Sequence, residues 1–313
     1  MKRETTNSKA KKVSRFFFFP VLVLIAGLVF IYSGAAQDLL TSQTLEVSPP
    51  SQEIQADPGT TITVKAVLRN RSKETLPIKA RVEDFTASGE EGQVALVEKS
   101  SYSLTGWTSV SPSSFTLNPG ESREVKATIS VPKNAAGGRY GSFVFSIQPT
   151  TPTGQTAAKV AQEIGSLFLV RISGPVNESL SLSEFAAPRF SEFGPIDFSL
   201  KFRNSGNVHV KTSGLINISN AFNKKVKDVV IKPTNIFPGS DRIIKATLDK
   251  RFLLGPYTAT AIVYYGDKNE VIVANANFFV LPVRIIAIAL IILFLIFALR
   301  KRLGKAFKVL FKG

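Results

Sequence analysis

Apolar and polar residues alternate one by one along several stretches of this chain. The apolar positions are Ile62, Val64, Ala66 and Leu68 in one stretch and Val125, Ala127, Ile129 and Val131 in another. A period of two is typical of a β-strand with one face in a core and the other in water. Pro-Gly precedes both stretches and indicates a turn, because Pro restricts φ and Gly adopts positive φ without steric cost.

The Pro-Gly frame occurs three times with Lys-Ala at the same offset after Gly. The copies are DPGTTITVKAVL (57–68), NPGESREVKATI (118–129) and FPGSDRIIKATL (237–248). The second and third copies both continue through a turn and Gly-x-Tyr (138–140 and 255–257) into another alternating stretch. VLRNRS (67–72) and KFRNSG (201–206) occupy matching places earlier in each half. The two halves therefore carry related strands in the same order.

Short strands, frequent turns and almost no helical periodicity predict an all-β fold of two tandem immunoglobulin-like β-sandwich domains. The first domain is predicted at 44–174 and the second at 175–281. Strands of the first domain are expected near 60–69, 76–85, 93–98, 121–131, 141–148 and 164–173. The polar segment 149–162 between the last two is predicted to be a long exposed loop.

Two long apolar segments lie near the ends of the chain. The first, 16–32, leads into SGAAQ, whose small residues suit cleavage near Ala35 or Ala36. Residues 1–36 are therefore interpreted as a signal peptide or, if uncleaved, an N-terminal anchor. The second, 282–299, is long enough as a helix to span about 27 Å and is predicted to be a transmembrane helix.

The formal net charge of +16 is concentrated at the two ends of the chain. Residues 1–15 hold six basic side chains and one acidic one, and 300–313 hold six basic side chains. Too little charge remains between them for a nucleic-acid surface. By the positive-inside rule both basic ends face the cytoplasm. We expect a cell-membrane protein, single-pass after signal cleavage, with most of the chain extracellular and a basic cytoplasmic tail at 300–313 that lies on anionic headgroups or is simply solvated.

Composition excludes several kinds of site. The chain has no Cys and one His, which rules out disulfides, thiolate nucleophiles and Cys/His zinc centres. His209 has no partner at a recognisable spacing and is interpreted as structural. AGGRYGS (136–142) is interpreted as a turn between strands, without the helix N-terminus that a phosphate loop needs. No cofactor is expected.

An acidic cluster and one aromatic segment are the remaining candidates. VEDFTASGEEG contains Glu83, Asp84, Glu90 and Glu91, which fit a glycosidase pair or a calcium site, but solvated carboxylates are the favoured interpretation. No catalytic or metal-binding residue is assigned, and the protein is predicted not to be an enzyme. Trp107, the only tryptophan, is either a core anchor between sheets or, with Tyr102, a platform for a sugar face.

VEDFTASGEEGQVAL, WTSVSPSSFTLNPGESREVKATISVPKNAAGGRYGSFVF and IGSLFLVRISG together resemble the peptidoglycan-binding domain of the bacterial WxL-interacting proteins, over about 44–174. The overall order of signal peptide, two sandwiches, membrane helix and basic tail is also similar to that family. The resemblance implies an envelope protein that binds peptidoglycan and surface proteins bearing the WxL motif. The second half matches less specifically.

Three kinds of function remain. The main prediction is a non-enzymatic, membrane-anchored surface protein that binds cell-wall peptidoglycan or surface protein partners. The alternative is a pilus-chaperone-like module that accepts a partner's strand, or an accessory subunit of an envelope complex. The strand-accepting alternative predicts an exposed edge strand with alternating apolar neighbours in the first domain. A membrane-bound hydrolase that uses the acidic cluster is a third hypothesis.

Overall fold

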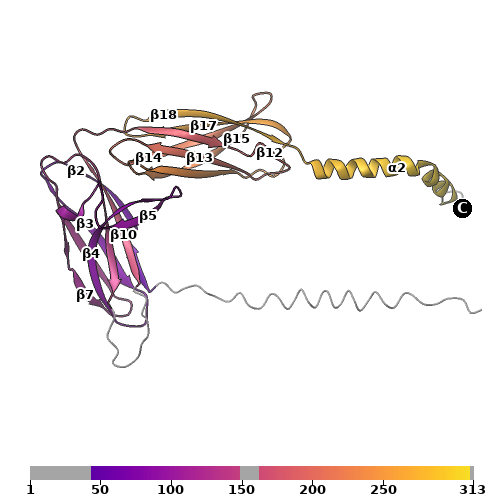
Figure 1. Ribbon diagram of the computed structural model, residues 1–313. Helices are drawn as coiled ribbons and strands as arrows, with labels where there is room; N and C mark the ends of the chain where they lie inside the picture. The colour runs from indigo at the N-terminus through magenta and orange to yellow at the C-terminus, as the bar shows by residue number, and fades with distance from the viewer. Residues whose placement is uncertain (1–43, 149–161, 311–313) are drawn as a thin grey trace, which may run out of the picture. The chain divides into compact units, whose positions relative to one another are not determined.

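The computed structural model describes residues 44–148 and 162–310, with side chains to residue 300. It contains two β-sandwiches and a C-terminal helix (Figure 1). The predicted signal segment 1–36 and nearly all of the predicted loop 149–162 lie outside the described residues.

The first sandwich consists of two sheets. One has the order β1 (Leu45–Ser48), β3 (Thr61–Asn70), β8 (Ser122–Ser130) and β6 (Thr108–Ser111). The other has the order β2 (Ser51–Ala56), β10 (Glu163–Ile172), β9 (Gly137–Ile147), β4 (Leu76–Ser88) and β5 (Gln93–Val97), with β7 (Ser114–Leu117) also on β4. Every pairing is antiparallel except that of β2 with β10. A short 3₁₀ helix, η1 (Thr105–Trp107), precedes β6.

Alternation along β3 and β8 builds the core of this sandwich. The antiparallel register sets Val64 opposite Ala127 and Ala66 opposite Val125, and all four side chains are buried. Phe143, Phe145 and Phe168 from the other sheet join the same cluster. Burial of such side chains, at about 25 cal/mol per Å² of apolar surface, is what holds two sheets face to face.

The second sandwich repeats this plan. One sheet has the order β11 (Leu180–Ala186), β13 (Ile196–Asn204) and β16 (Asp241–Leu248). The other has the order β12 (Phe190–Ser191), β18 (Glu270–Val280), β17 (Gly255–Tyr265), β14 (Val210–Asn220) and β15 (Lys225–Ile236). Phe198 and Phe202 of β13 lie in its core with Ile216 and Ile218 of β14.

The two sandwiches share one strand order except for β6 and β7, which have no counterpart in the second, and the predicted fold class of two immunoglobulin-like sandwiches is confirmed. The pair β3–β8 corresponds to β13–β16, and β10–β9–β4–β5 corresponds to β18–β17–β14–β15. The later two Lys-Ala copies are the equivalent strands β8 and β16, whereas the first copy is β3, the partner of β8. Lys65 therefore lies opposite Lys126, and Glu124 contacts both ammonium groups at 3.3 and 3.6 Å.

The C-terminal helix α2 (Val283–Leu310) begins two residues after β18. Its part from Val283 to Arg300 is long and apolar enough to cross a membrane, and none of it is buried against the sandwiches. Apart from Pro282, which precedes the helix, the predicted span 282–299 falls within α2. The helix also continues into the predicted tail, as far as Leu310.

Candidate binding surfaces and the joint between the sandwiches

Trp107 and Tyr102 belong to different packing clusters. Trp107 ends η1, packs partly buried against the core of the first sandwich, and has the Arg139 guanidinium 5.3 Å from its ring centroid. Tyr102 instead packs on Tyr140, with ring centroids 5.9 Å apart. The two rings therefore pack in different clusters, and a sugar platform of Trp107 and Tyr102 stays a prediction.

Asp84 corrects one expectation of the sequence analysis, because this carboxylate is fully buried rather than solvated. Its Oδ1 accepts hydrogen bonds from the N–H groups of Leu104 (3.0 Å) and Thr105 (3.1 Å), and its Oδ2 accepts one from Ser100 (3.1 Å). Burial alone would raise the pKa of Asp84, but a hydrogen bond from the Ser103 side chain, together with these backbone N–H groups, stabilises the charged form and the pKa is lowered. Asp84 thus fixes the loop that carries Tyr102 and η1.

The other acidic side chains of this segment are engaged in ion pairs. Glu83 contacts Arg81 at 2.6 Å. Glu90 and Glu91, at the tip of the β4–β5 hairpin, contact Lys201 and Lys245 of the second sandwich, each at 2.6 Å. The four carboxylates do not converge on a common point. Over 44–148 and 162–300 no group of three or more His, Asp or Glu side chains is arranged to hold a metal ion.

An aromatic cluster joins the two sandwiches. The hydroxyl oxygen of Tyr140 accepts a hydrogen bond from the backbone N–H of His209 at 2.6 Å. Phe237 of the second sandwich meets Tyr140 and Phe85 edge-on, with centroids 5.1 and 5.4 Å apart. Burial raises the pKa of Tyr140 and lowers the pKa of His209 to about 4, so both are neutral at neutral pH.

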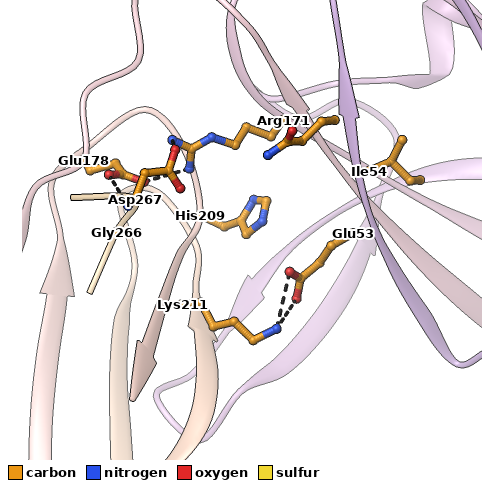
Figure 2. Close-up of a pocket in the computed structure, with 9 residues that line it drawn as sticks. Glu53, Ile54, Arg171, Glu178, His209, Lys211, Gly266 and Asp267 are labelled. Atoms are coloured by element: carbon orange, nitrogen blue, oxygen red, sulfur yellow. Dashed lines mark hydrogen bonds and ion pairs between the residues drawn. The ribbon is translucent and has the colours of Figure 1, made fainter. Parts of the chain in front are cut away.

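A polar pocket of about 410 Å³ lies beside this cluster (Figure 2). Arg171 contacts Glu178 and Asp267, both at 2.7 Å, and Glu53 contacts Lys211 at 3.1 Å. A hydrogen bond from Asn235, with Lys211 assisting, lowers the pKa of Glu53 against the opposing effect of burial. The remaining lining residues are Ile54, Gln55, His209 and Gly266.

The charged residues of this pocket connect the two sandwiches. General acid–base catalysis requires a group whose pKa lies near the working pH and which faces a free position. In the pocket the pKa of His209 is moved away from neutrality, and the carboxylates of Glu53, Glu178 and Asp267 are already paired with cations. Because these partners come from both sandwiches, the pocket holds them together rather than presenting a reactive group.

The edge of the five-stranded sheet in the second sandwich is open along β18. This strand pairs with β17 over its whole length, but β12 covers only Phe279 and Val280 on the other side. Among the described residues no strand pairs with that side of residues 270–278. The N–H groups of Phe279 and Leu281 donate to Arg189 and Ser191 on the β12 side. Peptide groups alternate in direction along a strand. Toward the start of β18, the N–H groups that point away from β17 are therefore those of Val271, Val273, Asn275 and Asn277.

An apolar row crosses the outer face of the same sheet up to this edge. The register aligns Val230, Leu215, Ile262 and Val273 on β15, β14, β17 and β18, with Tyr264 and Val271 in the adjacent row. Val230, Tyr264, Val271 and Val273 are exposed. Edge strands are usually protected by Lys or Pro, as β15 is by Lys225, Lys227, Lys232 and Pro233. Residues 270–278 contain neither.

The free edge at β18 lies in the second domain. The strand-accepting hypothesis expected an exposed edge strand in the first domain, where β1, β5 and β6 also end their sheets. In the first sandwich β2 covers Leu167 to Ile172 of the matching strand β10. Sequence reasoning missed the β18 edge, because alternation predicts which face of a strand is buried but not which strands pair with it. The lack of Lys and Pro in EVIVANANF was the one available signal.

The chain was compared with known proteins. No family model matches it, and no curated protein matches it. Among solved structures, it is similar to one described as a chaperone–tip adhesin complex of CFA/I fimbriae biogenesis, with 14% identity over 74% of this chain and 97% of that chain and a TM-score of 0.40. It is also similar to the class 5 fimbriae chaperone CfaA, with 16% identity over 75% and 98% and a TM-score of 0.38.

A third similar structure is the CsuC–CsuE chaperone–tip adhesion subunit complex of Acinetobacter baumannii. The identity is 14% over 67% of this chain and 90% of that chain, with a TM-score of 0.34. All three TM-scores are below 0.5. The sandwich fold described above rests on the strand pairing of this chain itself.

Proposed function

We propose that this protein is a non-enzymatic, membrane-anchored binding module that takes up an extended segment of a protein partner along the free edge of β18. The helix α2 supplies an apolar span followed by basic sequence, which favours a cytoplasmic C-terminus and sandwiches on the outside. The paired charges and neutral His209 of the interdomain pocket favour binding over catalysis.

One observation carries the proposal: residues 270–278 of β18 present outward backbone groups beside exposed Val271 and Val273. A strand added to such an edge gains main-chain hydrogen bonds, and its alternate side chains reach the apolar row. The favoured partner is therefore an extended protein segment with apolar residues at alternate positions, two of which would rest on Val273 and Val271.

The test uses the full chain in lipid nanodiscs and an array of nine-residue peptides with apolar residues at alternate positions, beside scrambled versions. We expect alternating peptides to bind and to protect the outward amides of Val271, Val273 and Asn275 from hydrogen exchange. Val273→Pro removes one outward donor and should weaken binding about tenfold, which corresponds to about 1.4 kcal/mol. Val273→Thr keeps the donor and the β-branched shape, and its added hydroxyl stays hydrated on this exposed face, so it should bind within about twofold of the original chain.

Equal binding by the Val273→Pro and Val273→Thr variants would refute strand addition at β18. Equal binding of alternating and scrambled peptides would do the same.

Peptidoglycan binding, implied by the WxL-interacting resemblance, stays a prediction that the same preparation tests. Co-sedimentation with purified peptidoglycan, lost in Trp107→Ala and kept in Trp107→Phe, would support it. No co-sedimentation of the original chain would leave the protein partner as the proposed ligand.

A further inference from the structure

Three large apolar side chains stand in solvent at one end of the second sandwich. Phe222 lies in the turn between β14 and β15, and Phe252 and Leu254 lie in the loop between β16 and β17. They are 90%, 76% and 67% exposed, respectively. Soluble surfaces seldom display several such side chains together without a partner.

This is the end of the sandwich from which α2 departs. The register sets Gly255, next to Leu254, opposite Val280, the last residue of β18. It also sets Asn220, at the start of the Phe222 turn, opposite Tyr257. We call the three loops at this end, 192–195, 221–224 and 249–254, the helix-side loops. The N–H of Gly194 donates to the carbonyl of Arg251 at 3.1 Å and joins two of them.

The link to α2 is too short to let these loops move far from a membrane that contains the helix. Only Leu281 and Pro282 separate β18 from α2, so Val280 and Val283 lie at most about 11 Å apart even when the chain is fully extended. The N–H of Leu281 donates to Ser191 at 3.0 Å, and Arg284 contacts Glu192 at 3.4 Å. These contacts hold the start of α2 against the sandwich.

The Phe222 turn is built to point its ring outward. Oδ1 of Asn220 accepts hydrogen bonds from the N–H groups of Phe222 and Lys224, both at 3.0 Å. Asn223 adopts a left-handed φ of 56°, which closes the turn. Because the backbone of this turn is satisfied, exposure of Phe222 is a property of an ordered turn.

Basic side chains lie on the same loops as the apolar ones or next to them. Exposed cations on or beside the helix-side loops are Arg189, Lys224, Lys225, Lys250 and Arg251. The acidic residues there are Glu192, which pairs with Arg284, Asp228, which pairs with Lys225, and Asp249. Apolar side chains ringed by Lys and Arg are the combination that enters the boundary between headgroups and acyl chains.

We propose that the helix-side loops insert Phe222, Phe252 and Leu254 into the interface of the same bilayer that α2 spans, with the surrounding cations on anionic phospholipid headgroups. This inference rests on the membrane anchoring proposed above. The second sandwich then contacts the lipid surface directly in addition to its covalent link to α2. Lys250 and Arg251 contribute an electrostatic attraction to the headgroups that salt screens.

The test places single tryptophan reporters in the full chain in nanodiscs of phosphatidylcholine with phosphatidylglycerol. Phe222→Trp and Phe252→Trp report on the helix-side loops, and Lys268→Trp is the matched control in the β17–β18 turn at the opposite end. Trp107 provides the same background in each variant. The lipids carry bromine on shallow or on deep acyl carbons, and quenching reports contact with the acyl region. Retention of the chain in nanodiscs after an alkaline wash is measured first.

We expect the reporters at 222 and 252 to be quenched at least about twofold more than the one at 268, and more by shallow bromine than by deep bromine. Lys250→Glu with Arg251→Glu should reduce this quenching in anionic but not in neutral nanodiscs.

Retained chains whose reporters at 222 and 252 are quenched no more than the one at 268 would overturn the inference while leaving the anchor intact. Blue-shifted emission without bromine quenching would also overturn it, because protein rather than lipid would then cover the rings. A chain that the alkaline wash removes would refute the anchor itself, and with it this inference.

Discussion

Asp84 shows how much a single buried charge organises in the first sandwich. Three backbone N–H groups, from Ser100, Leu104 and Thr105, converge on its two oxygens. The segment after β5 would otherwise have to bury these donors without acceptors. Asp84 is therefore a structural residue, and the adjacent Glu83 makes a partly exposed ion pair with Arg81.

Asp84→Asn should lower the free energy of unfolding by roughly 2 kcal/mol, because the amide nitrogen faces backbone donors that an oxygen had accepted from. Glu83→Gln is the matched control and should change it by less than about 1 kcal/mol. Chemical denaturation of the full chain in detergent measures both. The same Glu83→Gln variant addresses the hydrolase hypothesis, since release of sugar from cell wall that this variant abolished would contradict a non-enzymatic function.

His209 makes stability depend on pH in a narrow range. Its folded pKa is lowered to about 4 by burial, with Arg171 and Lys211 adding to the effect and Glu53 opposing it. The unfolded chain binds this proton near pH 6.5, so stability is fully present above that pH and falls as the pH decreases toward 4. The slope should approach about 1.4 kcal/mol per pH unit.

Denaturation at several pH values between 5 and 6.5 measures this slope. The chain has one His, so no other side chain has an ordinary pKa within that window, and Glu side chains, with a pKa of about 4.3, contribute only at its acid end. His209→Gln should flatten the profile there. A slope unchanged in this variant would show that His209 is not the group responsible.

At the scale of elements, β18 has two different sides. The peptide groups that point toward β17 are hydrogen-bonded to it. The peptide groups that point away from β17, from residue 270 to residue 277, face no strand in the described parts of the chain. The strand combines exposed Val271 and Val273 with a lack of Lys and Pro. Such an edge is a site for strand addition and, without its partner, a site for aggregation.

Native-state hydrogen exchange should therefore alternate along this strand. The amides of Val271, Val273 and Asn275 should exchange faster than those of Ile272 and Ala274 by at least about tenfold, because only the latter are bonded within the sheet. Exchange resolved by NMR, or by fragmentation in mass spectrometry, measures the difference. Uniform protection along the strand would mean that its outer edge is already paired, for instance with a second copy of the chain.

At the scale of the whole molecule, the two sandwiches are joined by both apolar and charged contacts. Tyr140, Phe85 and Phe237 form a buried aromatic contact, and Arg171 contacts Glu178 and Asp267 beside it. A second contact is made where the carbonyl of Glu90 accepts a hydrogen bond from Ile243 at 2.7 Å. The exposed ion pairs at that hairpin tip contribute little.

Tyr140→Phe tests the joint by removing one hydroxyl group. The N–H of His209 loses its acceptor inside a buried contact, which should lower the free energy of unfolding by roughly 1 to 2 kcal/mol. Tyr264→Phe, on an exposed ring, is the control and should be close to neutral. Calorimetry measures both, and proteolysis between residues 173 and 179 reports opening of the joint. Equal behaviour of the two variants would show that this hydrogen bond does not hold the joint together.

The sequence alone determined the β-sandwich architecture, the relation between the two halves and the apolar C-terminal helix. Each of these depends on a local pattern: alternate burial along β3 and β8, the Lys-Ala strands that recur as β8 and β16, and an apolar run from Ile285 to Leu299. Sequence reasoning left out β1, β2, β6 and β7. The strands β1, β6 and β7 have four residues each, too few to show a period, and β2 (SQEIQA) contains only two apolar residues, Ile54 and Ala56.

Only the tertiary structure decided what the individual polar and aromatic residues do. Asp84 and Glu83 are neighbours in sequence, yet Asp84 is buried and accepts hydrogen bonds from three backbone N–H groups, whereas Glu83 forms a partly exposed ion pair with Arg81. Trp107 and Tyr102 belong to separate clusters, and Glu90, Glu91 and His209 contact the opposite sandwich. These roles depend on contacts between residues far apart in the chain, and a period of two carries no information about which distant strand or domain lies alongside.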